Sequence, residues 1–188
     1  MVLKLDEKIL IYRVCLKKDP EAFGQLYDLY IEKIYRFIYF KISSKEETED
    51  LTSEVFLKVW RYLIDGTGKS VSSFSGLVYK VARNSLIDFY REKAKRQERL
   101  IDFTDSTKDI GDEFGVEKLE SGIDARKLIQ QIKKLKHDYQ EVLMLRYVED
   151  LSVSEIAEIV DKSSLSVRVL LHRATRKLKD LSESKNQK

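Results

Sequence analysis

Residues 151–160 have the sequence Leu-Ser-Val-Ser-Glu-Ile-Ala-Glu-Ile-Val and are followed by a short turn, Asp161-Lys162-Ser163, and by a periodic segment from Ser164 to Leu181. Ser152 with Glu155 three residues later predicts a capping box at the start of the first helix. A small side chain at Ala157 lets a second helix approach closely. Two short helices around such a turn indicate a helix-turn-helix.

The second helix of this motif has two different faces at 100° per residue. One face is an apolar stripe that we expect in the core: Val167, Leu170, Leu171, Ala174, Leu178 and Leu181. The other begins at Ser164 and is basic, with two apolar members: Leu165, Arg168, Val169, His172, Arg173 and Arg176. Arginine pairs with guanine or phosphate, and methyl-bearing side chains contact thymine. We expect a surface that contacts a DNA groove; the alternative is the solvated face of an ordinary amphipathic helix.

The sequence before the motif also predicts helices. Apolar residues recur at three- and four-residue spacing in 5–17, in a segment beginning at Asp19-Pro20-Glu21, and in 74–95, 123–136 and 138–148. Ser44 with Glu47 predicts a capping box for a further helix that ends near Ile64. Residues 65–73 contain Asp-Gly-Thr-Gly and predict a loop. Because no strand pattern occurs, the predicted fold is all-α.

Charge divides the chain into three parts. Residues 1–95 hold 17 Lys and Arg against 14 Asp and Glu, residues 96–122 hold 4 against 8, and residues 123–188 hold 14 against 10. The middle part lacks sustained periodicity and is rich in Asp, Glu, Ser and Gly. We therefore expect two helical domains, 1–95 and 123–188, joined by a flexible acidic linker, 96–122.

Composition excludes several classes of protein. One cysteine and two histidines among 188 residues make metal ligands scarce, and we expect neither a metal nor another cofactor. A signal-peptide core and an apolar run of membrane-spanning length are both missing, so the expected location is the cytoplasm, without membrane insertion. The sequence has no phosphate-binding glycine motif and no nucleophile elbow, and an enzyme is therefore not expected.

Four strings of residues occur in an order that resembles a known family. They are Asp19-Pro-Glu-Ala-Phe23 with Leu26-Tyr27, Asp50-Leu-Thr-Ser-Glu-Val-Phe56, Phe74-Ser-Gly-Leu-Val-Tyr-Lys-Val-Ala-Arg-Asn84 with Ile87-Asp88, and Leu143-Met-Leu-Arg-Tyr147 through Leu171-His-Arg-Ala174. Together they resemble bacterial RNA polymerase sigma factors of the sigma-70 superfamily, extracytoplasmic-function type. The resemblance implies that residues 1–95 bind polymerase and open the minus-ten promoter element, and that residues 123–188 recognise the minus-thirty-five element.

The resemblance also implies a polymerase-binding helix. Asp50, Leu51, Glu54, Val55 and Phe56 match the helix that family members press against the coiled-coil clamp of the largest catalytic subunit, beta-prime, within a core that also contains beta. Trp60 extends this set, because an acidic rim around exposed Phe56 and Trp60 suits an interface anchor. A core aromatic pair is the alternative for Trp60. Ser53 departs from the glutamine that the family often has there.

Further implied residues concern DNA. Lys80, Arg83, Asn84 and Arg91 match the helix that lies along promoter DNA, and the loop 65–73 is similar in position to one that captures an unstacked base. Arg146 resembles a residue that contacts the DNA backbone, but it can equally pair with Glu149 or Asp150. Lys162 departs from the aliphatic residue that the family commonly has in the turn, so either its stem snorkels or the turn shifts.

The family resemblance implies regulation by an anti-sigma protein. A different class of protein, a plain helix-turn-helix regulator with an N-terminal sensing or dimerisation bundle, would share the C-terminal motif. The acidic and aromatic helix at 50–60, combined with the basic end of the helix near residue 95, favours the sigma factor.

Overall fold

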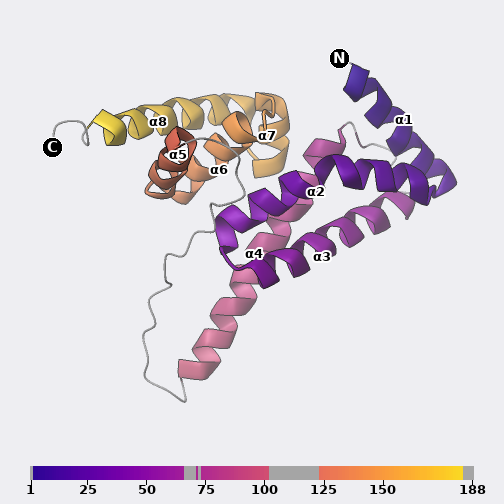
Figure 1. Ribbon diagram of the computed structural model, residues 1–188, viewed down its shortest axis with the longest axis horizontal. Helices are drawn as coiled ribbons and strands as arrows, with labels where there is room; N and C mark the ends of the chain where they lie inside the picture. Colours follow the sequence, from indigo (N-terminus) through magenta and orange to yellow (C-terminus); the bar gives the residue numbers. More distant parts are fainter. Residues whose placement is uncertain (1, 66–70, 72, 102–122, 184–188) are drawn as a thin grey trace. The chain divides into compact units, whose positions relative to one another are not determined.

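The computed structural model describes residues 2–65, 71, 73–101 and 123–183, and every regular element among them is a helix. The expected all-α fold is therefore confirmed. The chain separates into two compact units, residues 1–114 and 115–188. In the first unit α1 (Val2–Lys17), α2 (Pro20–Ile42), α3 (Lys45–Ile64) and α4 (Phe74–Ile101) pack together (Figure 1).

The described residues of the second unit, 123–183, form four α-helices and one π-helical segment. They are α5 (Ile123–Lys133), α6 (His137–Leu143), η3 (Met144–Val148), α7 (Val153–Val160) and α8 (Ser164–Glu183). Gln140 caps the C-terminal end of α5, because its Nε2 donates hydrogen bonds to the carbonyls of Lys133 and Leu135, each at 2.9 Å. The long α8 packs against α5, α6 and α7 (Figure 1).

Local sequence explains where α2 begins. The Asp19 carboxylate accepts hydrogen bonds from the backbone N–H groups of Glu21 and Ala22 at 3.0 and 3.1 Å, and Pro20 occupies the first helical position. Arg13 of α1 donates to the same carboxylate, with Nη2 at 2.7 Å from Oδ2. The backbone bond from Ala22, followed by the Arg13 bond, lowers the pKa of Asp19. One side chain thus caps α2 and ties α1 to it.

Helices in the first unit enclose a core of large apolar side chains. Those with almost no exposed surface come from all four helices: Val14, Leu26, Ile34, Phe37, Ile38, Val55, Val59, Leu63, Phe74, Val78 and Ala82. Their spacing follows the three- and four-residue periodicity of each helix. The face of each helix that turns away from this core is the one available for binding.

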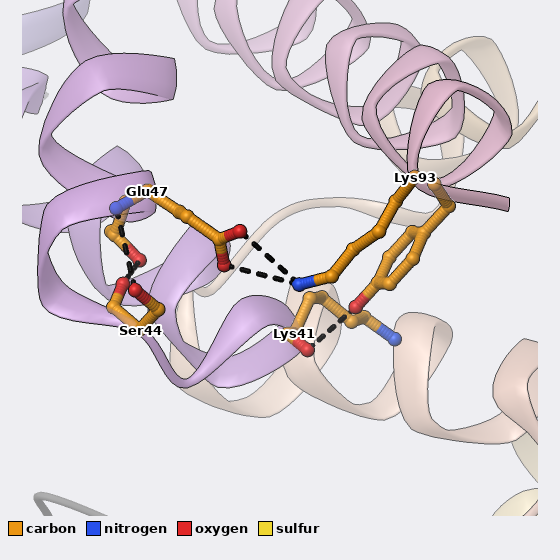
Figure 2. Close-up of polar contacts among 6 residues, drawn as sticks. Lys41, Ser44, Glu47 and Lys93 are labelled. Atoms are coloured by element: carbon orange, nitrogen blue, oxygen red, sulfur yellow. Dashed lines mark hydrogen bonds and ion pairs between the residues drawn. The ribbon is translucent and has the colours of Figure 1, made fainter. Parts of the chain in front are cut away.

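The turn between α2 and α3 is fixed by contacts from α4. Ser43 has a positive φ of 62°, and Ser44 accepts a hydrogen bond from the Glu47 N–H at 3.4 Å. The expected capping box is only half formed, because the Glu47 carboxylate binds Lys93 Nζ at 3.1 and 3.4 Å instead (Figure 2). The Tyr90 hydroxyl donates to the Lys41 carbonyl at 2.7 Å. These contacts hold the C-terminal half of α4 against the turn.

Some helix ends differ from those expected. α4 continues to Ile101 rather than ending at Lys95, because residues 91–101 are mostly strong helix formers and an i,i+4 contact joins Glu92 to Arg96 at 3.7 Å. α5 ends at Lys133, three residues early. The helix expected over 138–148 begins at His137 and changes to π-helical geometry at Met144. Of the expected linker, 96–122, residues 96–101 belong to α4, and residues 102–122 lie outside the described residues.

Candidate nucleic-acid and polymerase interfaces

The helix-turn-helix has the local geometry that its sequence predicts. Ser152 Oγ accepts from the Glu155 N–H at 3.3 Å, and the Glu155 carboxylate accepts from the Ser152 N–H at 2.9 Å, so the expected capping box is confirmed. Asp161 ends α7 with a φ of 54°. Ser163 Oγ then accepts from the Ser166 N–H at 3.2 Å and caps α8.

Lys162 does not disturb the turn. Its N–H donates to the Ala157 carbonyl at 3.0 Å, which is the six-to-one bond of a Schellman ending. Its side chain is exposed. The ammonium therefore stays in water, and the turn keeps its shape without an aliphatic residue at this position.

The two faces of α8 are separated as expected. Val167, Leu171 and Ala174 are buried, whereas Leu170, Leu178 and Leu181 at the edges of the stripe are half-buried. On the opposite face Leu165 is 70% exposed, and the exposed group also contains Arg168, Val169, His172, Arg173 and Arg176. Ser164, at the helix start, is half-buried. This face presents three arginines and two apolar side chains to solvent.

Arg146 has a contact that its sequence context did not predict. Its Nη1 donates to the Leu151 carbonyl at 2.8 Å, across the turn in which Asp150 has a φ of 52°. The guanidinium thereby fixes the backbone immediately before α7. Arg146 remains half-exposed, and a guanidinium has further donors that can reach a phosphate.

The structure corrects the expected arrangement of the polymerase-binding helix. Phe56 is 3% exposed, and its ring lies edge-to-face against Tyr27 at 4.7 Å between centroids. Half-buried Trp60 contacts Phe23 in the same way at 5.0 Å. Leu51 and Val55 are also buried. Phe56 is buried because it lies four residues after Thr52, on the side of α3 that other helices cover.

The exposed face of α3 is formed by different side chains. Asp50 and Glu54 point to solvent, as does Ser53, and Leu57 is 48% exposed. Residues 50, 53, 54 and 57 follow helical spacing, so this face could have been found from the sequence. The apolar group beside the two carboxylates is thus Leu57, rather than Phe56 or Trp60.

The predicted DNA-contacting residues of α4 do not all share one face. Lys80, Asn84 and Arg91 are exposed and fall within about 40° of one another at 100° per residue. Arg83 is half-buried and lies at least about 60° from them. Arg91 Nη1 contacts Asp88 Oδ1 at 3.1 Å. Residues 66–70 and 72 of the expected base-capturing loop lie outside the described residues.

The described part of the chain contains neither a metal-binding cluster nor a membrane-spanning helix. Among 2–65, 71, 73–101 and 123–183, His, Cys, Asp and Glu side chains form no group of three that could hold a metal ion. Over the same residues, no helix combines the length and the apolar character needed to cross a membrane.

Comparisons with known proteins agree on one family. The family model for sigma-70 region 2 matches residues 26–96, and the model for sigma-70 region 4 matches residues 125–178. The extracytoplasmic-function (ECF) RNA polymerase sigma factor BldN of Streptomyces coelicolor is 32% identical over 85% of this chain and 60% of its own length. The RNA polymerase sigma factor YlaC of Bacillus subtilis is 31% identical over 86% of this chain and 92% of its own length.

Solved structures share the fold. CnrH, in complex with the cytosolic domain of CnrY, matches 95% of this chain and 98% of its own with a TM-score of 0.68 and 20% identity. The sigma factor RpoE of Bartonella quintana, in complex with the anti-sigma factor NepR, matches 87% of this chain and 98% of its own with a TM-score of 0.64 and 19% identity.

Proposed function

Because the chain belongs to the sigma-70 family of RNA polymerase sigma factors, as a member of the extracytoplasmic-function type, we propose that its two helical units divide promoter recognition between them. The function of the family is promoter-specific initiation of transcription with RNA polymerase, and it is the function of this chain. In the proposed division, residues 1–95 bind polymerase and the minus-ten element. Residues 123–188 bind the minus-thirty-five element, and residues 96–122 connect the two.

The exposed basic face of α8 is the observation that carries the DNA-binding half of this proposal. Arg168, Arg173 and Arg176 are exposed, and no acidic side chain in the described part of the chain lies within ion-pairing distance of them. A helix that follows a capped helix and a tight turn enters the major groove with its N-terminal residues. Bases are therefore contacted by the first turns: Ser164, Leu165, Arg168, Val169 and His172. Arg173, Arg176 and Arg146 contact phosphates.

The polymerase-binding half rests on the outer face of α3. Leu57 supplies an exposed apolar group for the buried centre of an interface, and Asp50 and Glu54 supply charge for its polar rim. Leu51, Val55, Phe56 and Trp60 support this face from the core side. The surface that it contacts is the coiled coil of the beta-prime subunit, in a core that includes beta.

Promoter opening is assigned to α4. Lys80, Asn84 and Arg91 form an exposed stripe that suits a DNA backbone, and Arg83 reaches the same strand from the side. The loop 65–73 receives an extruded base. The energy for opening comes from binding, since unpairing a base costs a few kcal/mol that a pocket and phosphate contacts must offset.

Other parts of the proposal follow from the family. The chain performs no covalent chemistry of its own, because the polymerase catalyses RNA synthesis. It acts in the cytoplasm, where the promoters are, and an anti-sigma factor holds it inactive. An anti-sigma partner is named for the Bartonella relative, and the similar fold supports extending this to the present chain.

Reconstitution with core polymerase tests the proposed function. Adding the full chain to core on a library of promoter fragments, followed by sequencing of transcript starts, should yield starts at fixed distances from two shared elements. Core alone is the control. Starts at random positions, or none above core alone, would contradict the proposal.

Leu57→Ala tests the polymerase face. It should weaken core binding by about fivefold or more, which corresponds to a loss of about 1 kcal/mol or more. Leu29→Ala is the matched control, because Leu29 is an exposed leucine of α2 outside this face. Equal core affinities for the two variants would show that polymerase does not bind the outer face of α3.

A further inference from the structure

Helix α1 carries a second apolar stripe, on the side away from the core. Its core side is buried and comprises Leu10, Ile11 and Val14. On the opposite side Ile9, Tyr12 and Leu16 are 53%, 62% and 53% exposed. At 100° per residue these three span about 60°, and the middle of their arc lies about 180° from the middle of the buried arc. The exposed stripe is therefore not an edge of the core.

This outer face of α1 differs from that of an ordinary surface helix. Helix α3 shows the usual pattern, because its exposed positions are mostly charged, as at Glu46, Glu49 and Arg61. A helix that is apolar on opposite sides is normally covered on both of them. Positions 9, 12 and 16 also have the i, i+3 and i+7 spacing of the anchors with which one helix recognises another surface. The stripe therefore has the composition and spacing of a contact surface.

Positive charges border the stripe on both sides. Lys8 lies about 40° beyond Tyr12 around the helix, and Lys17 lies about 80° beyond Ile9 in the other direction. Both lysines are exposed. Among side chains 7–17 of α1, the one acid is Glu7, which lies on the core side and accepts a hydrogen bond from Tyr30 Oη at 2.6 Å. The border of the stripe is thus positive and complements an acidic partner.

We propose that α1 is a docking site for a protein helix that carries its own apolar stripe between acidic side chains. Apolar groups at the centre and opposite charges at the rim are the arrangement of a specific protein interface. A second copy of this chain would instead bring the same lysines together, at a cost in repulsion. The site lies beyond the proposed function, which uses α3, α4 and α8 and leaves the outer face of α1 without a role.

An anionic membrane is the other surface that attracts a basic and apolar helix. Helices that lie on membranes bury a large apolar face between acyl chains. The larger apolar face of α1 is already occupied by the core of the first unit, so only three side chains could insert. A protein helix needs no more than such a stripe, and it is the occupant that the observations favour.

A peptide selection against the immobilised full-length chain tests the proposal. The displayed library has random peptides of about 20 residues, enough for more than five helical turns. Counter-selection uses the triple variant Ile9→Ser, Tyr12→Ser and Leu16→Ser, whose fold is verified by circular dichroism. The surviving peptides should have apolar residues at helical spacing with Asp or Glu on both sides. Peptides without an excess of acidic residues, or none that distinguishes the two chains, would overturn the proposal.

Charge reversal on the chain then tests the border of the stripe, with one selected peptide labelled with fluorescein. Lys8→Glu combined with Lys17→Glu should weaken binding about fivefold or more in about 50 mM salt, and less in about 500 mM, because salt screens exposed charges. Lys134→Glu combined with Lys177→Glu is the matched control, since both are exposed lysines of the second unit. Equal weakening by the control would overturn the assignment of the charges to this site.

Other occupants of the stripe would be revealed by the same triple variant. The proposal is overturned if the substitutions abolish self-association in sedimentation, binding to phosphatidylglycerol vesicles, or binding to core polymerase. These results would assign the stripe to a second copy, a membrane or the polymerase. With core polymerase, the triple variant should give the same transcript starts as the unsubstituted chain. Failure of the proposed function would instead appear as absence of promoter-specific starts with the unsubstituted chain, so the two failures are distinguishable.

Discussion

Replacing Phe56 by alanine should remove a large part of the stability of the first unit. Phe56 is 3% exposed and its ring lies edge-to-face on Tyr27, so the substitution leaves a cavity between α2 and α3. Phenylalanine-to-alanine changes in cores cost about 3–5 kcal/mol, of which a lost aromatic pair accounts for about 0.5–1.5 kcal/mol. A domain has only about 5–15 kcal/mol of total stability, so the loss is severe.

Trp60 provides the assay, because it is the single tryptophan of the chain and packs on Phe23 in the same unit. Urea unfolding followed by its fluorescence therefore reports on this unit. Leu57→Ala, one position along the helix but half-exposed, should change the unfolding free energy by no more than about 0.5 kcal/mol. A loss below about 1 kcal/mol for Phe56→Ala would refute the assignment of Phe56 to the core.

Three other predictions concern caps and DNA contacts. Ser152→Ala should destabilise the second unit by about 1 kcal/mol, measured by thermal unfolding, because the α7 capping box loses one of its bonds. Arg168→Ala should relax base preference at one or two upstream positions in a randomised-promoter selection, whereas Arg176→Ala should weaken all promoters alike; the reverse result would mean that α8 enters the groove differently. Asp19→Asn should lower the free energy of unfolding at neutral pH. Because the pKa of Asp19 is lower in the folded chain than in the unfolded chain, the carboxylate stabilises the fold at pH values above its unfolded-state pKa, and this contribution is lost as pH falls through its folded-state pKa. The difference in stability between the variant and the unsubstituted chain should therefore vanish at low pH. Urea titrations over a pH series measure this convergence.

The features that sequence predicted well are those fixed by local chemistry. The faces of α8 follow from 100° per residue, and the caps at Asp19 and Ser152 follow from one side chain and the next turn of backbone. The start of α3 after Ser44 was also predicted, because it depends on the same kind of local cap. The basic face of α8, which is the candidate DNA site, was therefore available without any tertiary information.

Three features that sequence missed depend on which partner a side chain finds in the folded chain. Glu47 binds Lys93, 46 residues away, and so leaves the capping box half formed. Phe56 is covered because α2 supplies Tyr27, and a helical wheel of α3 alone cannot distinguish a covered edge from an open one. Arg146 donates to a carbonyl whose position depends on a left-handed residue, Asp150. These three errors concern the partner of a side chain, whereas the missed ends of α4 and α5 concern the helices themselves.

Stability can be gained at the left-handed residues that end α1 and α2, because their backbone conformation is unfavourable for a residue with a side chain. Lys18 and Ser43 have φ values of 50° and 62°, and each closes its helix with an N–H bond of 3.0 Å, to Val14 and Tyr39 respectively. A side chain in this conformation costs about 1–2 kcal/mol, whereas glycine adopts it freely at an entropic cost of about 0.5–1 kcal/mol. Neither residue lies on the proposed polymerase or DNA faces. A more heat-resistant form of the protein for structural work can thus be engineered at these two corners, with both binding surfaces left intact.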